Sequence, residues 1–356
     1  SDLEKMLKLA VLTFLCTYAF AAYYEDTAPM WIQKINNDPS QGFKAGYNPF
    51  LTGKSLEDMK RLMGTMMDRK SHSKARVVEH DLKAKASLPT SFQVGKDKWA
   101  ACAGTVNYVK DQADCGSCWA VAASSTIADR ICIANSASIE KQGDGLNENK
   151  PAIDMSAGQI MDCCSYCGQG CQGGYPIDAM RFYAYTGVVT GGWYGSNCGC
   201  YPYEIPPCPP SGCSGPEANT PSCKSSCRSG YSRSFNSDKH RGTDHYEVRG
   251  AANIQAEIYA KGSVECAFEV YENFMSYTSG VYKRKSGNYL GGHAVRVIGW
   301  GEEAGTPYWM IANSWNVTWG LNGFFKFKRG SDLCGMESQC VASVAKSADS
   351  NFQLTC

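Results

Sequence analysis

The feature that most restricts how this chain can fold is its cysteine content, 19 residues in 356. Many lie close together, in one cluster within 163–171 and a second within 198–227. Thiols stay reduced in the cytosol, so cysteines at this density predict a disulfide framework formed in an oxidising compartment. A zinc site is the alternative, because Cys115-x-x-Cys118 and Cys164-x-x-Cys167 have the spacing of a four-ligand set.

The start of the chain has the pattern of a secretory leader. Met6 begins a stretch with an early basic residue, an apolar core and an Ala19-x-Ala21 cleavage pattern. The stretch is too short to span a bilayer comfortably, and no other apolar run is long enough. We therefore expect residues 6–21 to be a signal peptide and residues 1–5 to take no part in the fold. Entry into the secretory pathway, with no membrane anchor after cleavage, favours disulfides over zinc.

Residues 22–87 differ in composition from the longer C-terminal part of the chain. They contain no cysteine and carry 11 Lys and Arg against 8 Asp and Glu, whereas residues 88–356 carry 22 against 24. The change indicates a pro-segment ahead of a mature domain, although a merely solvated leader would look similar. Ser55 and Asp58 suit a capping box before a short helix, and residues 70–85 are polar enough for a flexible linker. A net charge of +1 gives no indication of nucleic-acid binding.

The run from Gln112 to Ala120 has the features of a nucleophile at the start of a helix. Cys118 is followed by an Ala-rich stretch without Gly or Pro, as a packed helix requires, and Ser117 before it suits an N-cap. A thiol in the first turn feels the positive end of the helix, which lowers its pKa and favours the reactive thiolate. Cys118 is therefore the candidate nucleophile.

The base for this thiol would come from one of five histidines. His293 follows two glycines at the head of an apolar strand, where its ring can face a cleft. Asn313 can orient that ring with its side-chain amide, and Trp315 can shield the hydrogen bond from water. The other histidines are His72 and His80 in the predicted pro-segment and His240 and His245, which lie among polar residues and look solvent-exposed.

The second half of the chain is punctuated by glycine. Residues 251–262 have apolar residues at helical spacing and a glycine stop, and the apolar runs at 293–300, 307–313 and 323–328 are typical of strands. Helices first and strands later predict an α+β fold with two lobes.

The runs around Cys118, His293 and Asn313 together resemble the papain family of cysteine proteases. The cysteine-rich middle, with Cys171-Gln-Gly-Gly174-Tyr-Pro, resembles the cathepsin B group of that family, and the similarity covers essentially all of residues 88–345. The resemblance implies a papain-like fold with the active-site cleft between two lobes. The expected divisions are an inhibitory pro-segment at 22–87 and a catalytic domain at 88–356, with a helical lobe at about 101–243 and a β-rich lobe at about 244–345.

The resemblance also implies the role of each site residue. Cys118 attacks the scissile carbonyl as the thiolate, His293 passes the proton to the leaving amine, and Asn313 orients His293. The side chain of Gln112 and the backbone N–H of Cys118 form the oxyanion hole, without metal or cofactor. The implied substrate-binding residues are Gly173, Gly174, Ala294, Trp315 and Gln339.

Six disulfides are implied by the resemblance. They are Cys102–Cys132, Cys115–Cys171, Cys163–Cys223, Cys164–Cys167, Cys200–Cys227 and Cys208–Cys213. Apart from the nucleophile, the predicted mature domain holds an odd number of cysteines, so at least one more thiol is unpaired or bonds another molecule.

The implied partners are protein and peptide substrates, the chain's own pro-segment lying backwards through the cleft, and inhibitors of the cystatin type. The implied location is a lysosome or an extracellular space such as a digestive lumen. Two departures from the cathepsin B group affect specificity. Gln339 replaces a glutamate in the pocket for the second residue before the cut, which favours apolar residues over arginine unless Glu337 substitutes for it. The loop from Cys208 to Cys213 lacks the histidines that bind a substrate's C-terminal carboxylate, so we expect mainly endopeptidase action and weak dipeptidyl carboxypeptidase activity.

Two other functions compete with this one. A catalytically silent, protein-binding homologue would keep the fold without the chemistry, and a thiol–disulfide oxidoreductase would use Cys115 and Cys118 as its redox pair. Asn316 also begins a glycosylation acceptor sequence, but it lies close to the predicted active site.

Overall fold

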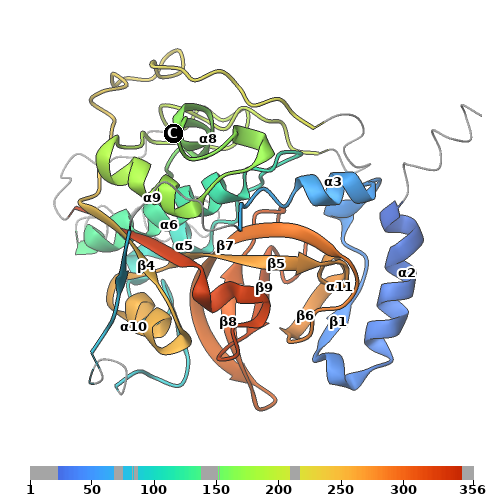
Figure 1. The fold of residues 1–356 in the computed structure, drawn as a ribbon. Helices are drawn as coiled ribbons and strands as arrows, with labels where there is room; N and C mark the ends of the chain where they lie inside the picture. Colours follow the sequence, from blue (N-terminus) through green and yellow to red (C-terminus); the bar gives the residue numbers. More distant parts are fainter. Residues whose placement is uncertain are drawn as a thin grey trace, which may run out of the picture.

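The protein is described by a computed structural model covering residues 23–67, 75–81, 83, 87–137, 151, 153–208 and 217–346. The predicted signal peptide at 6–21 and the loop residue Cys213 lie outside these ranges. A group of helices sits above a large mixed sheet, with residues 23–61 of the predicted pro-segment along one flank (Figure 1). None of the described helices is long and apolar enough to cross a membrane. The α+β, two-lobe architecture predicted from the sequence is confirmed.

The helical lobe is built around α6, Cys118–Ala134. Every residue from Cys118 to Cys132 is buried, which explains why the helix is rich in alanine on all sides rather than amphipathic. It packs against α8 (Ala157–Cys163), α9 (Pro176–Tyr185) and the short α5 (Ala103–Asn107), and its other side contacts the sheet through β7.

The β-rich lobe contains the strands expected from the apolar runs. The sheet order is β1-β6-β9-β8-β7-β5-β10-β4-β2, with β3 paired to β7 off this path. The elements are β3 (Phe92–Gln93), β4 (Asp244–Val248), α10 (Ala251–Lys261), β5 (Val264–Tyr271), α11 (Glu272–Met275), β6 (Tyr277–Tyr282), β7 (Tyr289–Glu303), β8 (Thr306–Ala312), β9 (Phe324–Lys328) and β10 (Cys340–Val344). Helix α10 ends at Gly262, as its glycine stop predicted.

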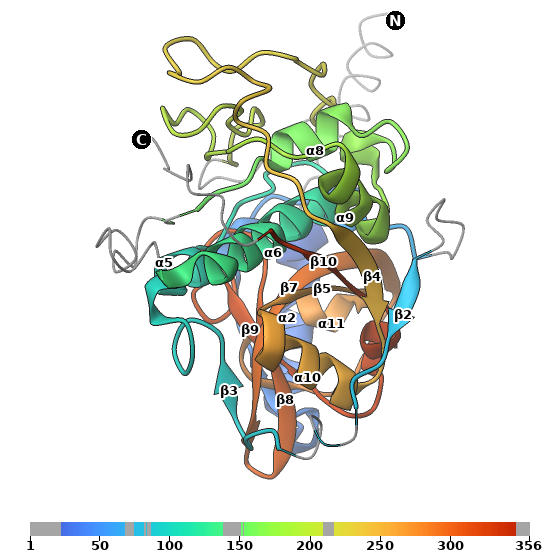
Figure 2. The same ribbon diagram turned by 90° about the vertical axis from the view of Figure 1, so that its left-hand side faces the viewer.

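The predicted pro-segment supplies the strand at each end of this order. It contains α2 (Tyr23–Asn36), β1 (Phe43–Ala45), α3 (Leu56–Arg61) and β2 (Arg76–Val78). Strand β1 pairs antiparallel with β6, and β2 pairs parallel with β4, as Figure 2 shows for the second pair. The flexible linker expected at 70–85 is therefore wrong over residues 76–78, because β4 offers unpaired backbone groups that order the segment as a strand.

Helix α3 has the predicted start. The Ser55 hydroxyl accepts from the backbone of Asp58, and the Asp58 carboxylate accepts from the backbone of Ser55, which completes the capping box. Helix α2 was not expected from the sequence, because Pro29 lies inside it. Shorter 3-10 helices connect the elements at Pro39–Gln41, Pro49–Leu51, Ala100–Cys102, Gly170–Gln172 and Leu333–Ser338.

Disulfides join parts of the chain that the packing alone would leave separate. The structure contains five of the six pairs implied by the resemblance, and Cys213 of the sixth lies outside the described residues. The bridges are Cys102–Cys132, Cys115–Cys171, Cys163–Cys223, Cys164–Cys167, Cys200–Cys227 and one that was not expected, Cys266–Cys340. Three members of the zinc set are thus oxidised, which excludes the zinc alternative. Within the described ranges the free thiols are Cys118 and Cys334.

Candidate active site

The candidate nucleophile lies where the sequence placed it, at the first residue of α6. Its thiol is fully buried, and the side chain contacting it comes from the predicted pro-segment: Thr65 Oγ1 lies 3.2 Å from Cys118 Sγ. Ser117 precedes the helix but does not cap it with its side chain, because its hydroxyl bonds the Tyr203 hydroxyl at 2.7 Å.

The imidazole, amide and indole expected beside the thiol come from three places in the β lobe. His293 lies on β7, Asn313 directly follows β8, and their Nε2 and Oδ1 atoms are 2.7 Å apart. Because an amide oxygen accepts, His293 carries its proton on Nε2 and leaves Nδ1 as the basic atom. The Trp315 ring covers this pair, with its centroid 4.6 Å from that of His293. The arrangement fits the predicted roles of orientation and shielding.

Burial sets the protonation of this pair. Desolvation by burial raises the pKa of the Cys118 thiol above its ordinary value, and the hydrogen bond from Thr65 only partly offsets that. Burial also lowers the pKa of His293 from 6.5 to about 4, against the opposing effect of Asn313. Burial in this structure therefore opposes the thiolate that the helix start would favour. Both shifts favour the neutral forms, and His293 Nδ1 has no hydrogen-bond partner among the described residues.

Gln112 is positioned by its neighbours and contacts the predicted pro-segment. Its Oε1 accepts from the Ser314 hydroxyl at 2.6 Å, and its Nε2 donates to the carbonyl of Cys115 at 2.8 Å. The same Nε2 donates to the Leu62 carbonyl at 3.0 Å. The Leu62 carbonyl of the predicted pro-segment thus accepts a hydrogen bond from the amide that was expected to donate to a substrate oxyanion.

Residues 62–67 continue past the thiol as an extended segment between the two lobes. The Gly174 N–H donates to Gly64 at 2.9 Å, and the Met66 N–H donates back to Gly174 at 3.0 Å, in parallel pairing. On the other side the Thr65 N–H donates to Gly292 at 2.9 Å. An added Cβ at Gly173 would lie 2.9 Å from the Gly64 carbonyl oxygen. Only glycine at position 173 therefore lets the two backbones approach this closely.

The remaining predicted substrate residues lie beside the thiol and directly before β10. Ala294 is fully buried in a small cluster with Cys118 and Ala122. Gln339 is held by its backbone, since its carbonyl accepts from the Ala267 N–H at 3.0 Å, and Ala267 lies opposite Ala294 in the sheet register. Gln339 therefore lies one strand away from Ala294.

Glu337, the alternative acid for that pocket, has another role. Its Oε1 accepts from the Trp309 indole at 3.0 Å and from the Gly330 backbone at 2.6 Å, and its Oε2 accepts from the Asp332 backbone at 2.9 Å. The carboxylate is buried, and both of its oxygens accept hydrogen bonds from these donors. It cannot substitute for a glutamate at position 339.

Several contacts of the predicted pro-segment were missed at the sequence level. The Asn48 amide donates to Met275 at 2.6 Å, and its oxygen accepts from Gly320 at 3.1 Å. The Lys54 ammonium is fully buried and lies 3.2 Å from Asp114. Single polar residues carry no periodic signal, so the partners of Asn48 and Lys54 could not be predicted from the sequence.

The environment of His240 differs from the expected one, and the disulfide of Cys115 argues against the redox alternative. His240 is buried, because its backbone pairs with Val188 in both directions, so the expectation of an exposed side chain is wrong. Cys115 is bonded to Cys171 rather than to Cys118, which removes the redox pair required by an oxidoreductase. The described residues contain no cluster of three or more potential metal ligands.

Comparison with known proteins agrees with this arrangement. A family model described as papain family cysteine protease matches residues 88–344. The gut-specific cysteine proteinase of Caenorhabditis elegans is 51% identical over 263 residues, covering 73% of this chain and 75% of that protein. Cathepsin B-like cysteine proteinase 4 of the same organism is 41% identical over 296 residues, covering 81% and 84%. The solved structure of procathepsin B S9 from Trypanosoma congolense has a TM-score of 0.73 at 31% identity, covering 89% of this chain and 98% of that one.

Proposed function

The chain belongs to the papain family of cysteine proteases, among relatives named cathepsin B-like, and we propose that it is the inactive precursor of an endopeptidase. In this proposal residues 6–21 are the signal peptide, residues 22–87 inhibit, and residues 88–356 form the catalytic domain. The observation that carries it is the pro-segment carbonyl of Leu62 on the amide of Gln112, beside a thiol contacted by Thr65.

The chemistry follows from the positions of the side chains. Once the pro-segment leaves, His293 Nδ1 takes the thiol proton and Cys118 Sγ attacks the scissile carbonyl carbon, forming the C–S bond. The oxyanion is stabilised by Gln112 Nε2 and by the Cys118 N–H, and His293 then returns the proton to the leaving amine. Water, deprotonated by His293, attacks the thioester, releases the acid and restores the thiol. Asn313 fixes the imidazole orientation in each step.

Specificity follows from Gln339 and from the loop that begins at Cys208. An amide at position 339 gives no charge partner to an arginine two residues before the cut, and Glu337 is committed elsewhere, so apolar residues are preferred. The loop from Cys208 to Cys213 contains two prolines and no histidine, so a substrate's C-terminal carboxylate finds no cationic donor there. Internal cleavage therefore dominates over removal of C-terminal dipeptides.

The proposed setting is the secretory pathway, leading to a lysosome or a digestive lumen. The disulfides require an oxidising compartment, and one relative is named gut-specific. Proteins, peptides and inhibitors of the cystatin type are the proposed partners.

The test is labelling by an epoxide inhibitor of thiol proteases. We expect stoichiometric labelling of Cys118 in the processed enzyme, with parallel loss of internal peptide cleavage, and neither in the unprocessed chain. The Cys118→Ala variant should lose both, whereas Cys334→Ala removes the other buried free thiol of the described residues and should keep both. Labelling without peptidase activity would favour a silent homologue. Disulfide reductase activity in place of peptidase activity would favour the oxidoreductase.

A further inference from the structure

A second part of the predicted pro-segment is bound far along the sheet from the thiol. Strand β2 pairs parallel to the outer edge of β4, with Arg76 opposite Tyr246 and Val78 opposite Val248. The other edge of β4 is already paired with β10. Removal of residues before 88 would therefore leave one side of β4 with unpaired backbone groups, a surface suited to an extended peptide.

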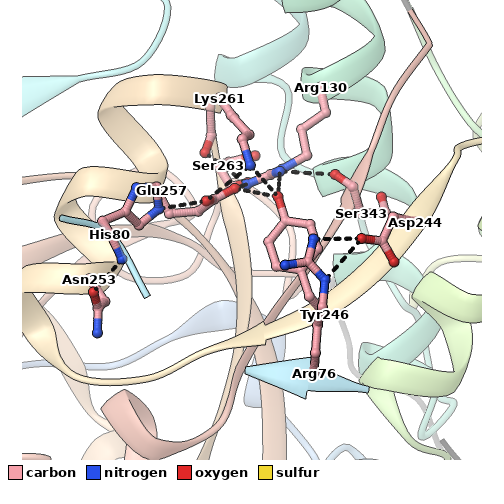
Figure 3. Close-up of polar contacts among 11 residues, drawn as sticks. Arg76, His80, Arg130, Asp244, Tyr246, Asn253, Glu257, Lys261, Ser263 and Ser343 are labelled. Atoms are coloured by element: carbon pink, nitrogen blue, oxygen red, sulfur yellow. Dashed lines mark hydrogen bonds and ion pairs between the residues drawn. The ribbon is translucent and has the colours of Figure 1, made fainter. Parts of the chain in front are cut away.

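Only one of the two oxygens of a buried carboxylate beside that edge accepts hydrogen bonds from the catalytic domain. Glu257 on α10 has a fully buried side chain, and its Oε1 accepts from Arg130 at 3.0 Å and from the Tyr246 hydroxyl at 2.6 Å (Figure 3). Its Oε2 is 2.8 Å from Nε2 of His80, and the next cation, Lys261, is 3.6 Å away. The hydrogen-bond partner of Oε2 is therefore supplied by the pro-segment.

The same edge binds the residues on both sides of that contact. The Asn253 side chain accepts from the His80 backbone at 3.1 Å and donates to the Glu79 carboxylate at 2.6 Å. Arg76 donates to Asp244 at 2.7 Å, as Figure 3 shows. Arg76, Glu79 and His80 of this short extended segment thus each have a polar partner in the catalytic domain.

We propose that the outer edge of β4, with Asp244, Asn253 and Glu257 beside it, is a second docking site for the chain's own pro-segment. It binds residues 75–81 independently of the cleft.

The charges at the site favour this docking. Burial alone would raise the pKa of Glu257, but the charge of Arg130, the hydrogen bond from His80 and the charge of Lys261 hold it below its ordinary value. The carboxylate therefore stays ionised in mild acid and remains an acceptor for the pro-segment. The titratable and charged groups packed around this contact are Arg130, Tyr246, Glu257 and Lys261, with Arg76, Glu79, Asp81 and Asp244 near the ends of the segment.

The Arg76 contact also persists in mild acid. Burial would raise the pKa of Asp244, but the hydrogen bond from Arg76 and its charge lower it overall, so this carboxylate also stays ionised in mild acid. The cleft behaves in the opposite way, because protonation of His293 would require that buried ring to become charged. Acid thus favours release of residues 62–67, while residues 75–81 stay bound.

The experiment uses processed enzyme with Cys118 blocked covalently and a labelled, end-capped peptide of residues 75–81, with fluorescence anisotropy at pH about 7.5 and about 5. We expect saturable binding at both pH values, since the acceptors Glu257 and Asp244 stay ionised over this range. A peptide with His80→Ala should bind more weakly at both pH values, and so should one with Arg76→Ala. On the enzyme, Asp244→Asn should match the second result, and Glu303→Gln, on the distant β7–β9 side, should change nothing.

The unprocessed Cys118→Ala chain provides the decisive control, because its own β2 fills the site. We expect it not to bind the peptide. Equal binding to the unprocessed chain, loss of binding in mild acid, or no saturable binding to the processed enzyme would each overturn the proposal. The proposal rests on the proposed function only for the identity of the processed form, and a lack of peptidase activity would appear in the epoxide titration and not in this binding.

Discussion

Adding one methyl group at Gly64 should open the active site of the uncleaved chain. A Cβ at this position would lie 1.6 Å from the carbonyl oxygen of Gly116 and 2.1 Å from its carbonyl carbon. Both groups are backbone, and Gly116 adjoins the Cys115–Cys171 bridge, so no side-chain rotation relieves the overlap. Ordinary contact begins at 3.4 Å, so residues 62–67 must move away from the thiol.

The expected size follows from the nature of the clash. Overpacking costs about 1–3 kcal/mol even where side chains can adjust. Here nothing can rotate, so the Gly64→Ala substitution should disfavour the closed arrangement by about 3 kcal/mol or more, which raises the open population about 100-fold or more.

Alkylation of Cys118 by a small reagent at neutral pH measures this opening without requiring turnover. Intact mass spectrometry reports the label on uncleaved chains only. We expect Gly64→Ala to react about 100-fold faster than the parent chain, and Met66→Ala, which removes atoms from the same segment without adding any, to react within a few-fold of it. Equal rates for Gly64→Ala and the parent, in folded and uncleaved protein, would refute the packing argument.

Three further outcomes are expected. Since the pKa of His293 falls to about 4 in the closed form, acidification from about 6.5 to 4 should favour opening by up to about 3 kcal/mol. In Cys118→Ala this should appear as lower hydrogen-exchange protection factors of residues 64–66, and the protection should not change with pH once His293→Gln is added. Gln339→Glu should raise kcat/KM about tenfold or more for substrates with arginine two residues before the cut, relative to leucine. Replacing Cys266 and Cys340 by alanine removes a bridge that spans 74 residues and should lower Tm by about 10 °C in a thermal melt.

Much of the site could be predicted because its residues lie in local patterns. The turn before Cys118 and the Ala-rich run after it specify a buried helix that starts at the thiol. The glycines before His293 and the apolar strand after it place the ring at the lobe boundary, next to the strand that leads into Asn313. These signals need no long-range information.

The parts that were missed depend on partners distant in sequence. Residues 76–78 lie in a polar stretch typical of a linker, but they form a strand because β4 leaves an edge unpaired. Cys266 and Cys340 meet only because β5 and β10 are neighbours in the sheet. The raised pKa of Cys118 likewise comes from burial of the thiol in the folded chain, which the local sequence around the helix start does not reveal.

The most direct test of the central claim, that the pro-segment keeps Cys118 and His293 neutral, is the pH dependence of Cys118 alkylation in the two forms. We predict that the processed enzyme reacts rapidly well into the acidic range, as an imidazole-paired thiolate does. The unprocessed chain should react only as the pH rises toward and above the ordinary thiol value of 9.0. Superimposable profiles for the two forms, with the unprocessed chain intact, would contradict the account.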